Sequence, residues 1–510
     1  MDPKIAVLES KNDYFAQLPN EILDKLFSFV PGLPNDGWMY VCRRWYELSK
    51  DPQRWASITL KKWRPKRLLG ALERAGQQPL NVVIDRLGSN AEETIKTMLG
   101  QAARLVSLNI CGDASEIDQV VALIVKVTAF PVLVSLALAK EEDLDIGNEA
   151  FYEYADQVPP LPLARMPKLS SLSLIGVRID YKAPLPSLTL LRLSWSRALY
   201  RLGRTLRLLQ KSPKLEALIL EDGRVDDPHP VDTDESEDEE ILASDRTLKE
   251  VQLPMLKRFK LRHWSSNMGV VLKHLTLPSH TRMSFDADQF DTEVLWNGFT
   301  SILQRQSQIS SLPMPQACLL RIEGHFSTRS SPQYLTIDTY AQDSLDTPAH
   351  FSLRFGEEPE PSENAAATKN FLRAIAPAHL SKLKHLYVAG ELLSKATWQA
   401  LFADGIIPLA SSVEHITIRV DDSHACELFI QSIQVAPPLR IVTVIVEEYS
   451  FYSKERIPDP LKQLAKAYFK AQGVKLPLLQ VRWEAEAIEA APGARESEEM
   501  KKWEDLRGVG

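Results

Sequence analysis

The residue types best suited to catalysis gather in one stretch, residues 421–426, which read Asp-Asp-Ser-His-Ala-Cys. A hydroxyl or thiol nucleophile near an imidazole base is the combination on which nucleophilic catalysis depends. The same stretch lies where a helix is expected to begin, and there Asp422 or Ser423 would serve as an N-cap for the first backbone N–H groups. We interpret the cluster as a helix cap and keep catalysis as the alternative.

The common phosphate-binding and metal-binding motifs are missing. Gly32 and Gly37 have the spacing of a phosphate-binding loop, but Trp38 and Met39 follow where Lys and Ser or Thr would be needed. The chain contains neither His-Glu-x-x-His nor Gly-x-Ser-x-Gly. Its four cysteines lie far apart with no metal spacing: Cys42, Cys111, Cys318 and Cys426. The sequence therefore predicts no enzyme, no cofactor and no metal, in a reducing compartment such as the cytoplasm or the nucleus.

Composition and charge are ordinary for a globular chain. Of the 510 residues, 44% are hydrophobic and 25% are charged. The formal net charge is −7, and residues 226–240 alone hold nine carboxylates and no Lys or Arg, which leaves +2 for the rest of the chain. A body this close to neutral gives no reason to expect a nucleic-acid partner.

Neither a signal peptide nor a membrane helix is expected. The N-terminus has no basic segment followed by an apolar one. The longest apolar stretch, residues 120–139, is interrupted by Lys126 and Pro131. We expect a buried helix followed by a strand there, and no membrane contact.

The elements that organise the chain begin near its N-terminus, with three apolar patches at fixed offsets. They are Leu-Pro-Asn-Glu-Ile-Leu at 18–23, Val-Cys-Arg-Arg-Trp at 41–45, and Trp55 just after Asp-Pro. Periodicity predicts an amphipathic helix over 20–29. A unit of about 45 residues buries too little surface to form its own core, so we interpret it as half of an interface.

This stretch resembles an F-box over residues 14–57, although residues 33–38 lack the apolar pair usual in the family. The resemblance implies docking on the Skp-type adaptor of a cullin-RING ubiquitin ligase, with Glu21 favourable at the helix N-terminus. The alternative is an unrelated helical cap with Trp45 and Trp55 in its own core. The adaptor-binding residues that the resemblance implies are Leu18, Pro19, Glu21, Ile22, Leu23, Leu26, Val41, Cys42, Trp45 and Trp55.

Beyond the module the pattern becomes that of alternating strands and helices. Strands are expected at 58–60 and 80–84, with a helix between them that Pro65 opens and Gly76 closes. A capping box, Ser89-x-x-Glu92, predicts the next helix. The run 61–67 holds five basic residues, which fits either a nuclear-import signal or a solvated seam between the module and the rest.

A phrase of the form Leu-x-x-Leu-x-Leu then recurs along the chain. Residues two apart in it share one face of a strand, and the first Leu covers the turn into that strand. The phrase resembles leucine-rich repeats, which implies an irregular solenoid with a parallel sheet and helices on the convex side. A doubly wound α/β domain is the alternative. The phrases begin at Leu133, Leu169, Leu188, Leu215, Leu256, Leu383, Val413 and Leu439.

Two segments interrupt this rhythm. Residues 317–356 predict three strands joined by Ser/Pro/Asp turns with little room for helices. The acidic run 226–240 is too charged to bury, so we expect a disordered insertion, with Ser236 as a candidate phosphorylation site. The expected organisation is a leader (1–12), the F-box (13–57), the repeat array (58–485) and a charged tail (486–510).

With Ala-Leu-Glu-Arg-Ala-Gly-x-x-Pro-Leu after the box, at 71–80, the chain resembles large fungal families of extended F-box proteins. We expect a ligase substrate receptor whose F-box binds the adaptor, and through it a cullin, while the repeats bind a protein target. The alternative is a repeat scaffold whose F-box joins a non-ligase assembly.

Overall fold

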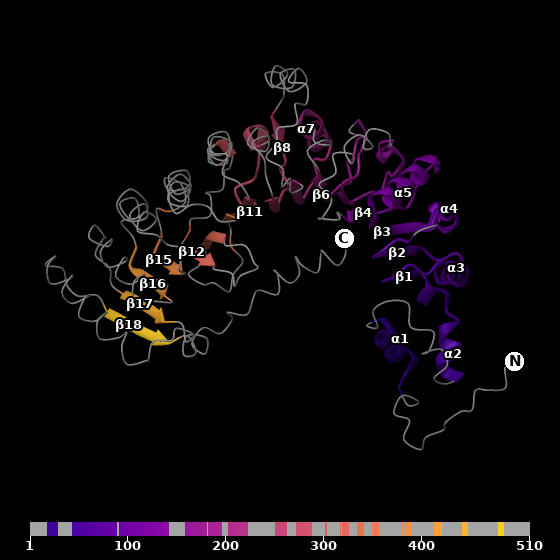
Figure 1. Cartoon of the computed structure of the whole chain (residues 1–510), viewed down its shortest axis with the longest axis horizontal. Helices are drawn as coiled ribbons and strands as arrows, with labels where there is room; N and C mark the ends of the chain where they lie inside the picture. Colours follow the sequence, from indigo (N-terminus) through magenta and orange to yellow (C-terminus); the bar gives the residue numbers. More distant parts are fainter. Residues whose placement is uncertain are drawn as a thin grey trace. The chain divides into compact units, whose positions relative to one another are not determined.

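The structure is a computed structural model of the chain. It describes residues 18–28, 43–88, 91–141, 159–180, 182–195, 202–222, 250–262, 272–287, 301–302, 317, 319–325, 334–340, 349, 351–355, 380, 383–389, 413–420, 441–446 and 478–483. These residues form a mixed α/β protein that divides into two units, with the boundary in the chain between Arg201 and Leu202. Each unit is described by itself (Figure 1).

Unit 1 begins with three short helices, α1 (Asn20–Ser28), α2 (Arg43–Ser49) and the 3-10 helix η3 (Pro52–Trp55). The N–H groups of Ile22 and Leu23 both donate to the carbonyl of Pro19 at 3.1 Å, so the first turn closes on the expected residue. Glu21 lies in that turn, where a carboxylate is favoured. The observed α1 matches the helix predicted over 20–29.

The strands of unit 1 form a parallel sheet in which neighbours in sequence are neighbours in space. Helices occupy several of the connections, and in Figure 1 they lie along one side of this sheet. The strands are β1 (Ser57–Leu60), β2 (Leu80–Ile84), β3 (Leu105–Asp113), β4 (Ser135–Glu141), β5 (Ser171–Ile175) and β6 (Leu190–Trp195). The helices are α3 (Pro65–Arg74), α4 (Glu92–Leu99), η4 (Ala102–Arg104), α5 (Ala114–Lys126) and η5 (Leu163–Arg165).

Local sequence explains where the helices of unit 1 begin and end. Pro65 is at the first position of α3, and Gly76 follows its end with φ +55, a left-handed conformation that favours glycine. The N-cap of α4 is Ala91, which gives no side-chain cap, and Ser89 of the predicted capping box lies outside the described residues. Helix α5 does have a capping-box contact at its start: the Asp113 N–H donates to Glu116 Oε2 at 3.2 Å.

The apolar layer of unit 1 lies between the sheet and these helices. Helix α3 buries Leu68, Ala71 and Leu72. On the strands, Leu108, Leu136, Leu172 and Leu191 occupy one row in register and are all at most 1% exposed. The residues of the recurring phrase therefore align between neighbouring strands, as expected, with each strand adding one Leu to the layer.

Unit 2 contains a mixed sheet and, among its described residues, helix α7 (Leu202–Gln210). The phrase residues again align: Leu218 with Phe259, and Leu220 with Leu261 and Phe285, all buried. The strands are β7 (Ala217–Asp222), β9 (Arg258–Arg262), β11 (Arg282–Ala287), β12 (Leu319–His325), β13 (Tyr334–Tyr340), β14 (Phe351–Phe355), β15 (His385–Ala389), β16 (His415–Val420), β17 (Ile441–Val446) and β18 (Leu478–Trp483). A small parallel pair, β8 (Val251–Gln252) with β10 (Leu275–Thr276), accompanies it.

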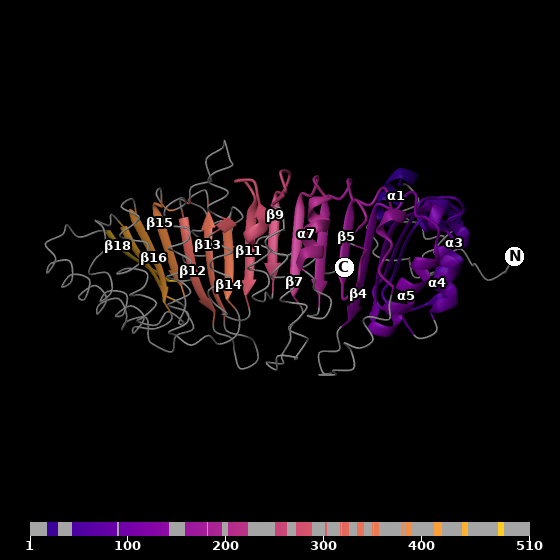
Figure 2. The same ribbon diagram turned by 90° about the horizontal axis from the view of Figure 1, so that it is seen from above.

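The three strands between residues 317 and 356 depart from a wholly parallel arrangement. Strand β13 pairs antiparallel with both β12 and β14, while β14 is parallel to β11 and β12 is parallel to β15. The order across the sheet is therefore β11-β14-β13-β12-β15 (Figure 2). The reason is the short connections, because a parallel crossover needs a dozen or more residues and an antiparallel one does not.

Several sequence predictions lie outside the described residues: the leader 1–12, the acidic insertion 226–240 and the tail 486–510. The stretch 120–139 contains the end of α5 and the start of β4, so the helix-then-strand prediction is confirmed. Within the part of the chain that the structure describes, no helix has the length and apolar character to cross a membrane.

Candidate partner-binding surfaces

The N-terminal helices are held together by a polar joint. The Arg44 guanidinium on α2 donates to Asn20 Oδ1, with Nε at 3.0 Å and Nη2 at 2.7 Å, and also to the carbonyl of Leu18. A guanidinium that bonds a side chain and a backbone carbonyl together fixes the start of α1 against α2. The second basic residue of Val-Cys-Arg-Arg-Trp therefore has a structural role within the module.

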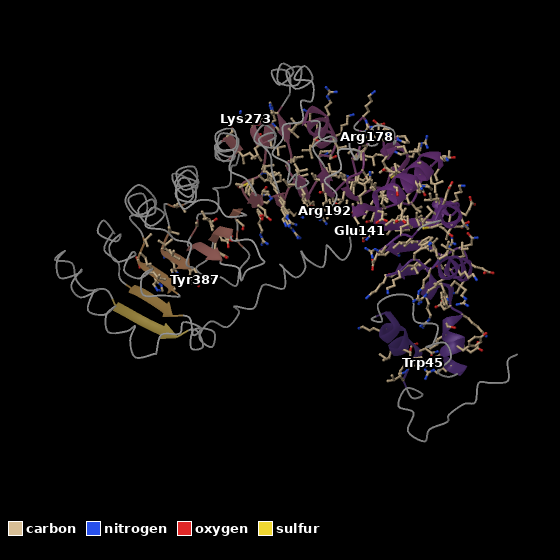
Figure 3. The ribbon with its side chains drawn as sticks, viewed as in Figure 1. Trp45, Glu141, Arg178, Arg192, Lys273 and Tyr387 are labelled. Carbon is tan, nitrogen blue, oxygen red and sulfur yellow. The ribbon has the colours of Figure 1, made fainter. Side chains whose placement is uncertain are left out.

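Several apolar side chains of the module remain at its surface. Ile22 on α1 is 45% exposed and Tyr46 on α2 is 44% exposed. Leu18 and Trp45, which is labelled in Figure 3, are half-buried. Two helices of nine and seven residues that expose this much apolar surface form a candidate binding surface.

Other residues that the F-box resemblance implies lie inside the module. Leu23 is fully buried and Trp55 is 3% exposed. The Trp55 indole N–H donates to the carbonyl of Ser49 at 2.6 Å, and the Arg74 guanidinium lies 4.4 Å from the centre of the Trp55 ring. In this structure Leu23 and Trp55 are buried within the module, and the Trp55 ring joins it to Arg74 of α3.

The remaining implied residues are placed only in part. Pro19 and Glu21 are exposed at the start of α1. Leu26 lies within α1, whereas Val41 and Cys42 are outside the described residues. Of the implied apolar residues on α1 and α2 whose burial the structure describes, Leu18, Ile22 and Trp45 are at least partly exposed.

The sheet of unit 1 has a second face, opposite the leucine rows, which we call the open face. Its residues alternate with the buried leucines along each strand. One row runs Ser107–Ser135–Ser171, and the next runs Asn109–Ala137–Ser173, in register. These side chains are small and uncharged, and Asn109 and Ala137 are only 5% and 7% exposed. The central part of this face is therefore neutral and formed by small side chains.

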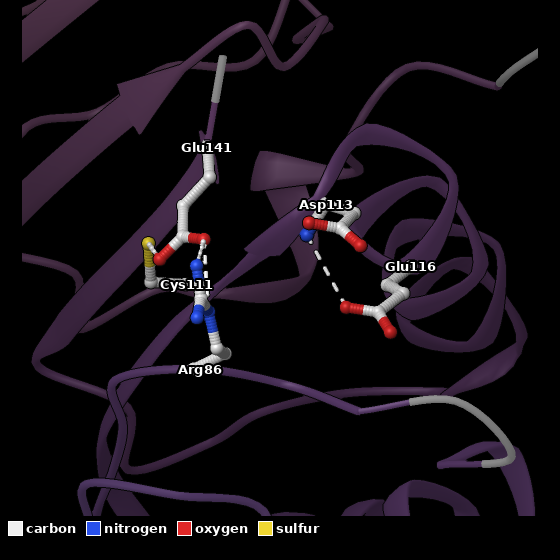
Figure 4. A network of polar contacts seen from close by, with 5 residues as sticks. All are labelled: Arg86, Cys111, Asp113, Glu116 and Glu141. Atoms are coloured by element: carbon white, nitrogen blue, oxygen red, sulfur yellow. Dashed lines mark hydrogen bonds and ion pairs between the residues drawn. The ribbon is translucent and has the colours of Figure 1, made fainter. Parts of the chain in front are cut away.

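Charge on the open face of unit 1 comes from Arg192 on β6, in register with Ser173, and from a network at the carboxyl ends of β2, β3 and β4, drawn in Figure 4. Arg86 donates to Glu141 Oε2 from Nε at 3.2 Å and from Nη2 at 3.0 Å. The Cys111 thiol lies 3.7 Å from Glu141 Oε1. Burial, and then the negative charge of Glu141, raise the pKa of Cys111 to about 11. A thiol with this pKa stays protonated and is a poor nucleophile or metal ligand.

Beside this network, burial raises the pKa of Glu116 above its ordinary value, while the hydrogen bond from the Asp113 N–H opposes that shift. Glu116 holds the loop that begins α5. Among the described residues no group of three His, Cys, Asp or Glu side chains is arranged to hold a metal ion. We therefore regard this network as structural.

The open face of unit 2 carries several charged side chains close together. Strand β9 places Arg258, Lys260 and Arg262 on this face, and β11 places Arg282, Ser284 and Asp286 beside them in register. Arg258 and Arg282 are exposed and adjacent. Arg262 Nε lies 3.4 Å from Asp286 Oδ2, with these side chains 24% and 16% exposed.

Further along unit 2 the open face becomes aromatic and hydroxylic. The rings of His385 on β15 and His415 on β16 stack with centroids 4.2 Å apart and planes 10° apart. His385 Nε2 is 2.9 Å from Thr417 Oγ1, and His415 Nε2 is 3.0 Å from Thr443 Oγ1. Tyr387 lies next to them on β15 (Figure 3). The threonines are at most 6% exposed, so this ladder is a fixed surface.

Sequence reasoning did not identify these open-face residues, although the signal was present. In Leu-x-x-Leu-x-Leu the second and third variable positions face away from the leucine layer. In the phrase 256–261 these positions are Arg258 and Lys260, and in the phrase 383–388 they are His385 and Tyr387. The other candidates from the sequence, residues 421–426 and Ser236, lie outside the described residues.

Comparison with known proteins adds no assignment: no family model matches the chain, and no curated protein matches it. The functional argument therefore depends on the residues and surfaces described above.

Proposed function

We propose that this protein is the substrate-recognition subunit of a Skp–cullin–F-box ubiquitin ligase. In this proposal the N-terminal module binds the Skp-type adaptor, which connects it to a cullin, and the strand array, a degenerate leucine-rich-repeat solenoid, binds one protein target. The ligase chemistry belongs to the partner subunits, so the chain itself needs no catalytic residue.

The observation that carries the proposal is the exposed apolar surface on a module with F-box spacing. Ile22 is 45% exposed at the position where the F-box pattern has an apolar contact residue. Exposing such a side chain in water has no benefit for folding, whereas burying its remaining exposed surface against a partner contributes roughly 1 kcal/mol. Buried Leu23 and Trp55 keep the module folded while Leu18, Ile22 and Trp45 make the contact.

The repeated strands support the second half of the proposal. Neighbouring strands β3, β4, β5 and β6 place one Leu each in the same buried row, as expected for stacked repeats. Such an array leaves a continuous open face, which suits recognition of an extended protein surface.

The proposal is tested by pull-down of the adaptor with purified full-length protein. We expect Ile22→Asp to reduce adaptor capture at least tenfold, because a carboxylate would be buried against an apolar partner surface. Trp45→Ala and the double variant Leu18→Ala/Pro19→Ala should have a similar effect, since interface truncations of large apolar anchors often cost about 2 kcal/mol or more.

Leu69→Asp is the matched control, because Leu69 is an exposed apolar residue, 38% exposed, on α3 outside the module. It should bind the adaptor like the unaltered protein. Adaptor capture that is equal for Ile22→Asp and Leu69→Asp would contradict the F-box assignment. Capture of the adaptor without a cullin would favour the alternative, a repeat scaffold in a non-ligase assembly.

A further inference from the structure

Four cations gather on two neighbouring strands of unit 2, on the open face. We call this surface the basic strip and define it as Arg258, Lys260, Arg262 and Arg282. The carboxylates on the same face of β7, β9 and β11 are Glu221 and Asp286. Glu221 is 7% exposed as a whole residue, and the side chain of Asp286 is 16% exposed. Both lie in the row of Arg262, at the carboxyl ends of the strands. At the other end of the strip, Arg258 and Arg282 are exposed.

The arrangement of the two exposed arginines has an electrostatic consequence. Arg258 and Arg282 are register partners on parallel strands, and neighbouring strands lie about 4.8 Å apart. An anionic group bound between them would gain charge-assisted hydrogen bonds from both guanidinium groups.

We propose that the basic strip binds a carboxylate-rich segment of the protein target, an inference that rests on the proposed receptor function. The geometry favours a peptide over a nucleic acid for two reasons. The open-face positions of β7, β9 and β11 contain no aromatic side chain on which bases could stack. Asp286 and Glu221 also interrupt the positive charge, which a continuous phosphate backbone would meet unfavourably.

An extended acidic peptide fits the same pattern. Its carboxylates would meet Arg258 and Arg282 at one end of the strip and Lys260 in the next row, and uncharged residues would lie over Arg262, which is already paired with Asp286. From Arg258 to Arg262 a strand spans about 13 Å, so about five residues of an extended peptide cover the strip.

The test uses purified full-length protein and a fluorescent peptide with the sequence of residues 226–240, which holds nine carboxylates. Fluorescence anisotropy is measured at low and at high salt. We expect saturable binding that weakens as salt rises. Arg258→Glu/Arg282→Glu should weaken binding at least tenfold at low salt.

The matched control is Lys61→Glu/Lys62→Glu, which makes the same change in net charge at two exposed lysines of unit 1. It should leave peptide binding within about twofold. Equal losses in both double variants would show that only net charge matters and would overturn the proposal. A single-stranded oligonucleotide of equal charge that binds more tightly than the peptide would also overturn it.

Two further measurements distinguish this proposal from binding of the chain's own acidic run and from the F-box assignment. Peptide binding that is detected only after deletion of residues 226–240 would mean that the chain's own acidic run occupies the strip, against a role in target binding. Adaptor pull-down with Arg258→Glu/Arg282→Glu should be unchanged. Failure of the basic strip and failure of the F-box assignment therefore give different results.

Discussion

The two units build the same buried layer but very different open faces. In unit 1 the rows opposite the leucines are Ser107–Ser135–Ser171 and Asn109–Ala137–Ser173, which are small and neutral, and Arg192 on β6 continues the second row. In unit 2 the equivalent positions of β9 and β11 hold mainly arginine and lysine, and those of β15 and β16 hold stacked histidines. In both units the leucine rows on the opposite side of the sheet are almost fully buried.

This difference separates what folds the chain from what it recognises. The leucine positions are constrained, because each must fill the space between a strand and the next element. The open-face positions carry no such constraint, so their side chains are free to differ between strands. Charged and aromatic side chains are therefore more frequent on the open face of unit 2, and that face is where we propose that the target binds.

The largest effect is expected from truncating one buried leucine in each unit, which tests whether the two leucine layers are equivalent. Leu172 on β5 and Leu261 on β9 are both fully buried to within 1% and lie in aligned rows. We expect Leu172→Ala and Leu261→Ala each to lower the free energy of unfolding by about 2 to 5 kcal/mol. Chemical denaturation followed by tryptophan fluorescence measures the loss. A loss below about 1 kcal/mol at either site would show that the two layers are not equivalent.

A smaller effect is expected at the one thiol on the open face of unit 1 that the structure describes. With its pKa at about 11, Cys111 has very little thiolate at pH 8, so alkylation should be at least tenfold slower than for an ordinary cysteine. Site-resolved mass spectrometry after iodoacetamide treatment measures the rate, with the urea-unfolded chain as the reference. Glu141→Gln should raise the rate only in part, since burial is the larger cause. Fast labelling of the folded protein would mean that Cys111 is more accessible to water than its burial in the structure implies.

The smallest effect is expected from deleting residues 226–240. The spacing from Leu218 to Phe259 is 41 residues, and without the 15 acidic residues it becomes 26, close to the 27 from Leu191 to Leu218. Lengthening a surface loop costs little, about 0.6 kcal/mol per doubling. We expect the deletion to change the melting temperature by only a few degrees and to leave adaptor binding intact, as measured by calorimetry and pull-down. An insoluble or strongly destabilised deletion variant would show that the acidic run is part of the fold.

Much of the fold was predictable because local patterns fix it. The helix over 20–28, the strand at 57–60, the Pro65 start and Gly76 end of α3, and the strands carrying the leucine phrase all follow from periodicity and capping residues. The helix and strand in the stretch 120–139 follow from the same signals. Each depends on contacts within a few residues, which a sequence displays directly.

The candidate sites were less predictable for the opposite reason. Spacing placed Leu23 and Trp55 with the contact residues, but only the packing of α1, α2 and α3 shows that both are buried and that Ile22 is exposed. The order β11-β14-β13-β12-β15 depends on which strands pair, and that is decided between residues distant in the chain.

By itself the sequence determined the periodic elements, the leucine layer and the F-box resemblance, because these depend on residue types at short, regular spacings. Only the tertiary structure decided which neighbours meet across the strands. Arg258 and Arg282 are 24 residues apart, and His385 and His415 are 30 residues apart, yet each pair lies side by side. Register between strands sets these contacts, and it depends on the length and path of the connections, which short-range patterns do not record.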